Sequence, residues 1–280
     1  MPAMSPEAMQ NAVLAWYSQN GRDLPWRKTR DPYAILVSEV MLQQTQVARV
    51  VPRYREWLER WPTVEALAAA TPADVIQAWS GLGYNRRAVN LHRCAQAVVA
   101  RGGFPHEQAE LQKLPGIGPY TAAAIACFAF GAQIAAPDTN ALRVLERAFP
   151  GADVPVPAGR AYEWNQALFD LGREVCIART PRCGVCPLAA GCPSRGRTYA
   201  PLRRQSRFEG SFRQRRARLL RAIGDAGRLP ESEADAEALV SLVRDGLAEV
   251  SGGEARLPGQ TSLATSAASP SSEGSSASGA

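Results

Sequence analysis

Apolar residues recur at three- and four-residue steps through most of the first 195 residues, which is the period of an amphipathic helix. The pattern runs from Val37 to Val51, where Pro52 is expected to end it. Similar stretches follow at 64–79, 86–101, 120–130, 141–149 and 162–175. Glycine and proline separate these stretches, and we find no convincing β alternation before residue 245. The first 195 residues are therefore predicted to be all-α.

The composition of the chain changes from Ser206 onward. Helical periodicity continues in a basic stretch at about 211–224 and an acidic one at about 231–242, and Gly252-Gly253 predicts a hairpin turn. Two helices and a hairpin indicate a small, basic, winged-helix-like appendage over residues 206–258. Residues 259–280 are rich in Ser, Ala and Gly and contain no aromatic residue, so we expect a disordered tail.

Length and charge narrow the classes of protein that the chain could belong to. With 280 residues it is long enough for two domains, and it contains no apolar run long enough to span a bilayer. The net charge of +6 favours a polyanionic partner. Ten arginines and one acid stand between Pro193 and Arg221, which indicates either a phosphate-contacting segment or a solvated basic linker.

Four cysteines within seventeen residues carry the clearest chemical signal, at the spacing C-x6-C-x2-C-x5-C. Iron–sulfur clusters take four Cys ligands, whereas zinc modules usually present two C-x2-C pairs on a longer arm. The N-terminus lacks the apolar core of a signal peptide, so a disulfide framework is disfavoured. We predict an iron–sulfur cluster, with zinc as the alternative, on the following ligands: Cys176, Cys183, Cys186 and Cys192.

A glycine-rich turn lies between two helical stretches at Leu114-Pro115-Gly116-Ile117-Gly118. Gly116 and Gly118 permit close backbone approach and positive φ, and Pro119 suits the first turn of the next helix. Amides at such a helix start can bind phosphate, and Thr121 lies in the same turn. The pattern is typical of the hairpin of helix-hairpin-helix DNA-binding proteins, although it also fits an ordinary tight turn.

The hairpin, Asp138 and the cysteine loop occur in the order seen in the helix-hairpin-helix base-excision glycosylases, which residues 10–195 resemble. Two stretches, S-E-V-M-L-Q-Q-T-Q-V at 38–47 and W-S-G-L-G-Y at 79–84, resemble the adenine DNA glycosylases of the MutY family. The resemblance implies an all-α, two-domain fold that holds a 4Fe-4S cluster. Its domains would be a six-helix barrel domain with the hairpin (29–134) and an iron–sulfur cluster domain (1–28 and 135–200).

The resemblance also implies the reaction, which is hydrolysis of the N-glycosidic bond of adenine mispaired with 8-oxoguanine or guanine in double-stranded DNA, during base excision repair. Glu39 would protonate the leaving adenine, since a carboxyl group in an apolar pocket has a raised pKa. Asp138 would face the cation-like sugar, and Asn140 would position the reacting groups. From the residues alone, Glu39 could instead be a solvated helix residue and Asp138 an ordinary N-cap.

Strand cleavage is not expected, because Tyr120 stands where endonuclease III-type enzymes carry their lysine nucleophile. Gln44 and Tyr84 are expected, by resemblance, to wedge into the base stack, although a helix-surface glutamine and a packed aromatic are the plain alternatives. The predicted DNA-binding residues are Gln43, Gln44, Tyr84, Gly116, Gly118, Thr121 and Arg143.

The chain departs from the resembled family in several places. Asn85 stands where a second tyrosine is common, and Thr139 replaces a glycine. We also expect the chain to lack the usual C-terminal 8-oxoguanine-recognition domain and to carry the appendage in its place. Two alternatives stay open: a thymine or uracil mismatch glycosylase, and a non-catalytic iron–sulfur DNA-binding module. We expect a monomer in the cytoplasm, associated with the nucleoid, without membrane contact.

Overall fold

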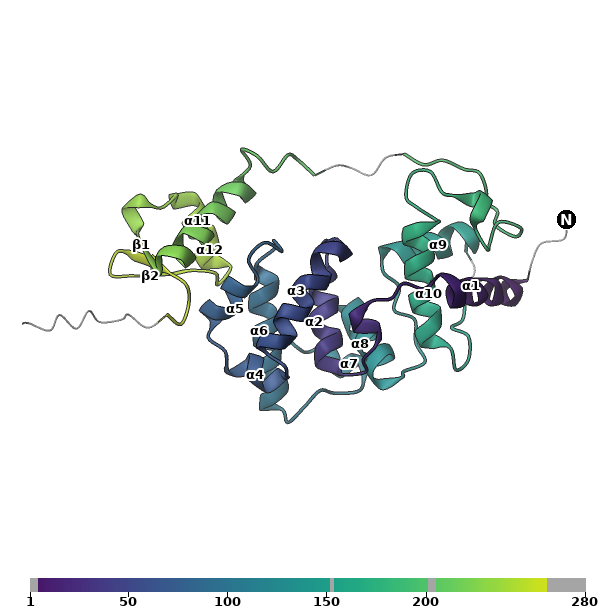
Figure 1. The fold of residues 1–280 in the computed structure, drawn as a ribbon, viewed down its shortest axis with the longest axis horizontal. Coiled ribbons are helices and arrows are strands. Elements are labelled where there is room, and N and C mark those ends of the chain that lie inside the picture. Colours follow the sequence, from purple (N-terminus) through teal and green to yellow (C-terminus); the bar gives the residue numbers. More distant parts are fainter. Residues whose placement is uncertain (1–4, 152–153, 201–204, 261–280) are drawn as a thin grey trace, which may run out of the picture.

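The computed structural model describes residues 5–151, 154–200 and 205–260 (Figure 1). Residues 5–151 and 154–200 form helices and no strands, as the apolar periodicity predicts. Short 3-10 turns lie at Pro25–Arg27 and Cys183–Val185. The α-helices of this part are α1 (Pro6–Asn20), α2 (Pro32–Leu42), α3 (Val47–Arg60), α4 (Val64–Ala69), α5 (Pro72–Ala78), α6 (Arg86–Ala100), α7 (Gln108–Leu111), α8 (Pro119–Phe130), α9 (Thr139–Ala148) and α10 (Ala161–Glu174).

Polar N-caps and prolines at the first helical position explain where helices begin. Asp31 caps α2 by accepting hydrogen bonds from two amides of its first turn, and Pro32 occupies the first position. Thr71 and Pro72 start α5 in the same way. The predicted single helix at 64–79 is therefore two helices, because the residue before a proline is driven out of the α conformation.

The predicted continuous helix from Val37 to Val51 is also wrong. α2 ends at Leu42 and α3 begins at Val47, while Pro52 lies inside α3 instead of ending a helix. Gln44, in the connection, has a φ of 56°, which lies outside the α-helical region. This break exposes the connection between α2 and α3 as a surface loop, which matters for the site described below.

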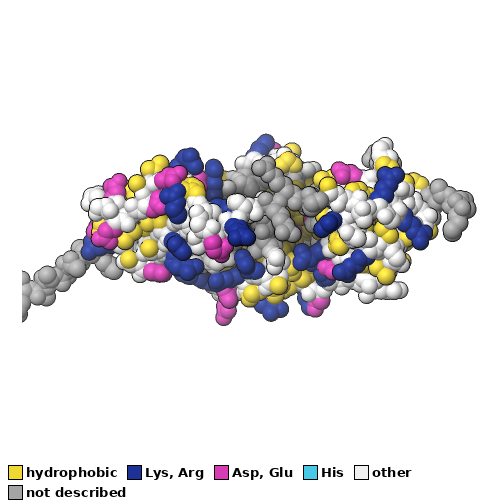
Figure 2. Space-filling model, turned by 90° about the horizontal axis from the view of Figure 1, so that it is seen from above, with side chains coloured by type: hydrophobic (Ala, Val, Ile, Leu, Met, Phe, Trp, Pro, Cys, Tyr) yellow, Lys and Arg dark blue, Asp and Glu magenta, His cyan; other side chains and the backbone are white. Residues whose placement is uncertain are grey.

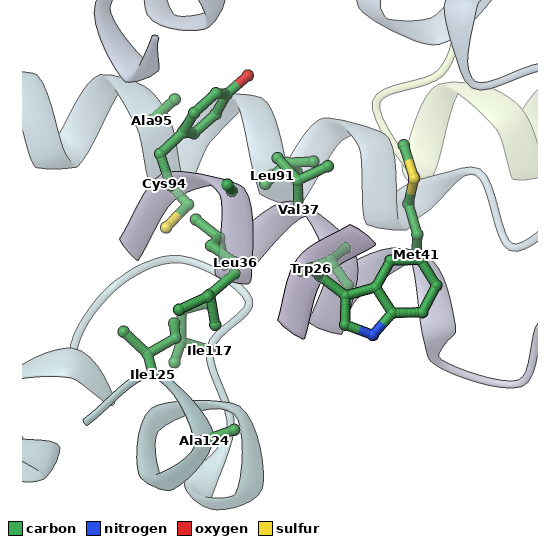
Figure 3. Close-up of a cluster of buried hydrophobic side chains, with 14 of the residues drawn as sticks. Trp26, Leu36, Val37, Met41, Leu91, Cys94, Ala95, Ile117, Ala124 and Ile125 are labelled. Atoms are coloured by element: carbon green, nitrogen blue, oxygen red, sulfur yellow. The ribbon is translucent and has the colours of Figure 1, made fainter. Parts of the chain in front are cut away.

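The largest hydrophobic core surrounds α2, whose residues Tyr33–Met41 are all buried. α2 contacts α3, α6 and α8, and Figure 3 shows Leu36 pointing toward Ile117 and Ile125. Burial of each such aliphatic side chain is worth about 1.5–3 kcal/mol. α2 is thus a central helix, and any polar group on it is removed from water.

A second core joins α1, α9 and α10, and three cysteines of the predicted cluster loop pack at its edge. The first core falls largely within the predicted domain 29–134, and the second falls within 1–28 and 135–200. The domain boundaries themselves stay a prediction. The separation matters because α8 and α9, which carry candidate site residues, belong to different cores.

The appendage contains two helices, α11 (Phe212–Ala226) and α12 (Ala236–Arg244), and a three-stranded antiparallel sheet. The predicted hairpin is formed by β2 (Glu249–Ser251) and β3 (Glu254–Arg256), and β1 (Arg228–Pro230), which the sequence pattern missed, pairs with the other side of β3. The predicted disordered tail falls, from residue 261 onward, outside the described residues.

The appendage packs against the end of the molecule opposite α1 (Figure 1). Its core includes Leu219 and Ile223 of α11 together with Ala73 and Ile76 of α5. The appendage is therefore attached to the first core through α5. Within the part of the chain that the structure describes, no helix combines the length and apolarity needed to cross a membrane.

Candidate active site and nucleic-acid interface

Glu39 is the only acidic residue of α2, and its side chain lies inside the first core with 6% of its surface exposed. The hydroxyl group of Tyr120, on α8, hydrogen-bonds to its carboxyl group. Burial raises the pKa of Glu39 to about 7; the Tyr120 hydrogen bond and Arg27 lower it, and Asp138 raises it. Glu39 can therefore hold a proton near neutral pH, as the sequence predicts.

Tyr120 stands in the first turn of α8, next to Pro119. Burial raises the pKa of Tyr120 well above its ordinary value, and the negative charge of Glu39 raises it further. The phenol consequently keeps its proton and donates toward the Glu39 carboxyl group. Tyr120 is thus a neutral hydrogen-bonding partner of the Glu39 carboxyl group.

Asp138 caps α9 from the second core. Its Oδ1 accepts a hydrogen bond of 2.7 Å from the amide of Ala141, and its Oδ2 accepts one of 2.7 Å from Asn140 Nδ2. A helix N-terminus with two aimed donors suits a carboxylate in its charged form. Asp138 is close enough to Glu39 and Tyr120 to raise the pKa of both, so the structure brings together all four predicted catalytic residues.

Arg143 joins this carboxylate to the cysteine loop. Its Nη2 donates to Asn140 Oδ1 at 2.9 Å and to the Gly172 carbonyl at 2.6 Å, and its Nε donates to the Cys176 carbonyl at 2.8 Å. Burial lowers the pKa of Arg143. The predicted DNA contact of Arg143 stays a prediction, since the structure shows its guanidinium bound to protein groups.

α9 and α10 approach each other closely at Gly172. A Cβ atom at this position would lie 2.6 Å from the carbonyl oxygen of Asn140. No side chain can be accommodated at that distance, so the glycine is what allows α9 to sit where it does. The position of Asp138, at the start of α9, depends on this contact.

Sequence reasoning missed a buried ion-pair network beside Glu39. Asp170 is fully buried and receives Arg22 Nε at 2.6 Å and Arg27 Nη1 at 2.7 Å. Burial alone would raise the pKa of Asp170, but the hydrogen bonds and charge of Arg27 lower it overall. The partners lie more than 140 residues apart in the chain, so no local pattern could have revealed them.

The predicted DNA-binding loops lie on the surface beside these groups. Tyr84 is 47% exposed, and its hydroxyl accepts a hydrogen bond of 3.1 Å from the Nε2 of Gln205, which directly precedes the appendage. A pocket lined by Gln43, Gly116 and Asn90 connects the loop after α2, the hairpin and α6. Figure 2, which views the molecule from above, shows basic side chains spread along its length among acidic and hydrophobic ones, and such basic groups can contact phosphates.

The hairpin agrees with its prediction at Gly116 and differs from it at Gly118. Gly116 has a φ of 76°, and a Cβ there would lie 2.7 Å from the Asn90 Cβ, so glycine is required. Gly118 instead has a φ of −89° and caps α8. Thr121 is 3% exposed, so its side chain belongs to the core, and its predicted DNA contact stays a prediction.

All four cysteines of the loop line a single pocket together with Arg147 and Arg195. The two arginines offset the negative charge that four thiolate ligands would bring. Burial, and then the neighbouring thiols, raise the pKa of Cys186 to about 11, so a bound metal centre would supply the positive charge that favours its thiolate.

The spacing of the thiols bears on the choice between a cluster and zinc. A zinc site needs four donors that converge on one ion, whereas each cysteine of an iron–sulfur cluster can bind its own iron. Within the described ranges, no group of three His, Cys, Asp or Glu side chains is placed to hold a metal ion. The pocket nevertheless gathers four cysteine side chains, which is the donor set that an iron–sulfur cluster needs, so its residues fit that group.

The comparisons with known proteins agree with this geometry. Residues 37–158 match the family described as HhH-GPD superfamily base excision DNA repair protein, and residues 176–192 match the iron–sulfur binding domain of endonuclease III. The predicted iron–sulfur cofactor is thereby confirmed.

We expect Cys186→Ala to lose bound iron and to lower the yield of folded protein, because one of four ligands is removed. Iron and acid-labile sulfide per chain, together with visible absorbance, measure the loss. Cys94→Ala is the matched control, since Cys94 is buried outside the loop. Equal iron content in both variants would contradict the ligand set.

Solved structures share the fold. A thermostable thymine-DNA glycosylase superposes with a TM-score of 0.63 and 29% identity, over 68% of this chain and 95% of that one. An endonuclease III from a non-covalent DNA complex superposes with a TM-score of 0.59 and 23% identity, over 68% and 96%. The helical glycosylase fold is thus confirmed.

Relatives named adenine DNA glycosylase align over most of the chain. One from Mycolicibacterium smegmatis is 43% identical over 85% of this chain and 91% of its own length. One from Mycobacterium tuberculosis (strain H37Rv) is 42% identical over 89% and 93%. The human protein is 41% identical over 68% of this chain but only 40% of its own length. The chain therefore belongs to the adenine DNA glycosylase family, the base excision repair enzymes that hydrolyse the N-glycosidic bond of adenine in DNA.

Proposed function

We propose that this glycosylase removes adenine paired with 8-oxoguanine or guanine, acting as a monomer on double-stranded DNA and leaving the strand uncut. The observation that carries the proposal is the buried Glu39 carboxyl group, with a pKa raised to about 7, close to the helix-capping carboxylate of Asp138. Two carboxyl groups in such different surroundings suit one proton donor and one ionised group.

The reaction begins with extrusion of the adenine nucleotide, since the glycosidic bond cannot be reached within the duplex, at a cost of a few kcal/mol. Gln44 and Tyr84 are the candidates to fill the space that the base leaves. Both stand on exposed loops beside the core that holds Glu39. Gln43 lines the adjoining pocket, and the hairpin amides after Gly116 can bind the backbone phosphate.

Glu39 then acts as general acid. Adenine is a poor leaving group as an anion, so a proton on its imidazole-ring nitrogen must accompany cleavage. The carboxyl group supplies this proton while the bonding electron pair moves from the sugar carbon to adenine. Tyr120 keeps the carboxyl group oriented through its hydrogen bond.

Asp138 stabilises the positive charge that develops on the sugar as the bond breaks. Its two hydrogen bonds fix the carboxylate before substrate arrives, so no reorganisation accompanies the reaction. Asn140 holds one carboxylate oxygen and is itself held by Arg143. Water adds to the sugar carbon, and the proton that it loses returns to the carboxylate of Glu39, which completes hydrolysis and restores the acid.

The chain offers no lysine at the reacting bond. Its two lysines, Lys28 and Lys113, form exposed ion pairs with Asp23 and Glu110. Tyr120 occupies the position of the endonuclease III nucleophile, and its phenol stays protonated. These contacts support a monofunctional enzyme.

The likeness to a thymine-DNA glycosylase favours mismatched thymine as a second substrate candidate. Duplexes that carry adenine opposite 8-oxoguanine, adenine opposite guanine, thymine opposite guanine and uracil opposite guanine separate the two. We expect abasic sites, revealed by alkali, in the two adenine duplexes only. Cleavage confined to the thymine or uracil duplexes would overturn the proposal.

Glu39→Gln and Asp138→Asn should each lower single-turnover adenine excision by about 10²–10⁴-fold, because each removes a group that acts on the breaking bond. Glu65→Gln, an exposed residue of α4, is the matched control and should be unchanged. If either active-site variant released adenine as fast as the parent, the assigned role of that residue would be wrong.

The rate of excision should depend on pH through Glu39. The carboxyl group is protonated, and therefore active, below its pKa of about 7, and it is ionised above it. We expect the single-turnover rate to fall toward about tenfold per pH unit above neutrality. Glu39→Gln should lack this alkaline decline, and a decline that persists in the variant would assign it to another group.

Borohydride should trap little or no covalent complex between the wild-type protein and its DNA, since no amine attacks the sugar. Tyr120→Lys should gain such a complex, because a buried lysine has a lowered pKa and can act as a nucleophile. Gel electrophoresis of labelled duplex after reduction measures both. Efficient trapping of the wild-type protein would refute the monofunctional assignment.

A further inference from the structure

The two wedge candidates share an unusual backbone conformation. Gln44 has a φ of 56° and Tyr84 a φ of 47°, and within the described ranges they are the only non-glycine residues with positive φ. Such a conformation costs about 1–3 kcal/mol and persists only where surrounding contacts impose it. Something in the structure must therefore hold both loops.

The residue that holds both loops is Arg87, near the start of α6, whose guanidinium group reaches the end of α2. Its Nη1 donates hydrogen bonds of 2.8 Å, 3.0 Å and 2.7 Å to the carbonyl oxygens of Val40, Met41 and Gln43. These carbonyls lie where α2 ends, and the negative end of a helix dipole favours a cation there. Arg87 thus fixes the point at which the chain leaves α2 and enters Gln44.

The other nitrogens of Arg87 hold the Tyr84 loop. Nη2 donates to the Gly83 carbonyl at 2.9 Å, and Nε lies 3.4 Å from the carbonyl oxygen of Tyr84. Nη2 also donates to Thr45 Oγ1 at 3.1 Å, directly after Gln44. The guanidinium carbon lies 5.6 Å from the centre of the Tyr84 ring. One side chain therefore binds both loops.

The chemistry of this position demands arginine. Arg87 is 9% exposed, and burial lowers its pKa to about 10, so it still carries its charge at neutral pH. The partners named above are carbonyl and hydroxyl oxygens, spread over two loops. A guanidinium presents five N–H donors in a fixed plane, whereas a lysine ammonium presents three from one point.

We propose that Arg87 is a positioning residue that locks the Gln44 and Tyr84 loops into one rigid unit, so that both wedges enter the duplex together. This inference rests on the wedge roles in the proposed function. It gives Arg87 no contact with the reacting atoms. Its effect on excision passes through the two loops.

The rate of single-turnover excision tests the inference when Arg87→Lys is made in two backgrounds. One is the wild-type protein, and the other lacks the side chains of Gln44 and Tyr84. In the wild-type background we expect at least a tenfold loss of rate, since small misplacements of positioning groups have large kinetic effects. In a Gln44→Ala/Tyr84→Ala background the same change should cost no more than about twofold, because residues that act as a unit are not additive. A loss of equal size in both backgrounds would overturn the role assigned to Arg87.

A second readout follows extrusion directly, through the fluorescence of 2-aminopurine placed at the target adenine. Gln44→Ala, Tyr84→Ala and Arg87→Lys should each reduce the rise in fluorescence on binding. If the two wedge variants leave it unchanged, the wedge roles of the proposed function fail. If they reduce it and Arg87→Lys does not, only the inference about Arg87 fails.

Two controls separate positioning from loss of structure. Arg216→Lys alters another partly buried arginine, which bonds Ser241 and Asp245 in the appendage, and should keep full activity. Thr45→Val removes one of the acceptors of Nη2, together with the hydroxyl's own hydrogen bond to the Gln43 carbonyl, and should show a smaller loss of the same non-additive kind, even if Arg87→Lys folds poorly. Additive loss in Thr45→Val would contradict the proposal.

Discussion

The burial of a single carboxyl group in the middle of α2 links the fold of this protein to its chemistry. α2 is buried from Tyr33 to Met41 and contacts α3, α6 and α8, so Glu39 is removed from water by the same packing that stabilises the first core. The free-energy cost of ionising a buried carboxyl group keeps the proton on Glu39 near neutral pH. The Tyr120 hydrogen bond from α8 offsets part of that cost and fixes the orientation of the group. The helix that organises the core is therefore also the helix that supplies the proposed acid.

The second carboxylate comes from the other core, so the proposed reaction draws on both halves of the molecule. Asp138 is fixed by α9, which packs on α10 and binds the cysteine loop through Arg143 and Arg147. Glu39 is fixed by α2 and α8. The proposed reaction depends on the distance between two separately built helices. The iron–sulfur loop, which does no hydrolysis in this scheme, contributes by stabilising the half of the protein that carries Asp138.

Sequence reasoning succeeds here where the signal is local or where the resemblance supplies it. The cysteine ligands lie within one short loop, so their spacing alone indicated the cofactor. The meeting of Glu39, Asp138 and Tyr120 could not be derived from spacing, and it required the resemblance to known glycosylases. Arg87 and the pair of Arg27 with Asp170 were missed because their partners are distant in sequence and are mostly backbone carbonyls or single carboxylates. The break after Leu42 was missed for the same reason, since a side chain on α6 stabilises it.

Gly172 shows how a residue without a side-chain functional group can determine the measured activity of an enzyme. An alanine there would meet the Asn140 carbonyl at 2.6 Å and push α9 away from α10. Such a variant would leave every reacting side chain intact, yet an activity assay would score it as a catalytic defect. When inherited or engineered variants of these glycosylases are ranked, loss of turnover at such glycines should be read as misplacement of a carboxylate. A compensating substitution would then be one that makes room on α9, the helix facing Gly172, and not one that replaces Asp138 itself.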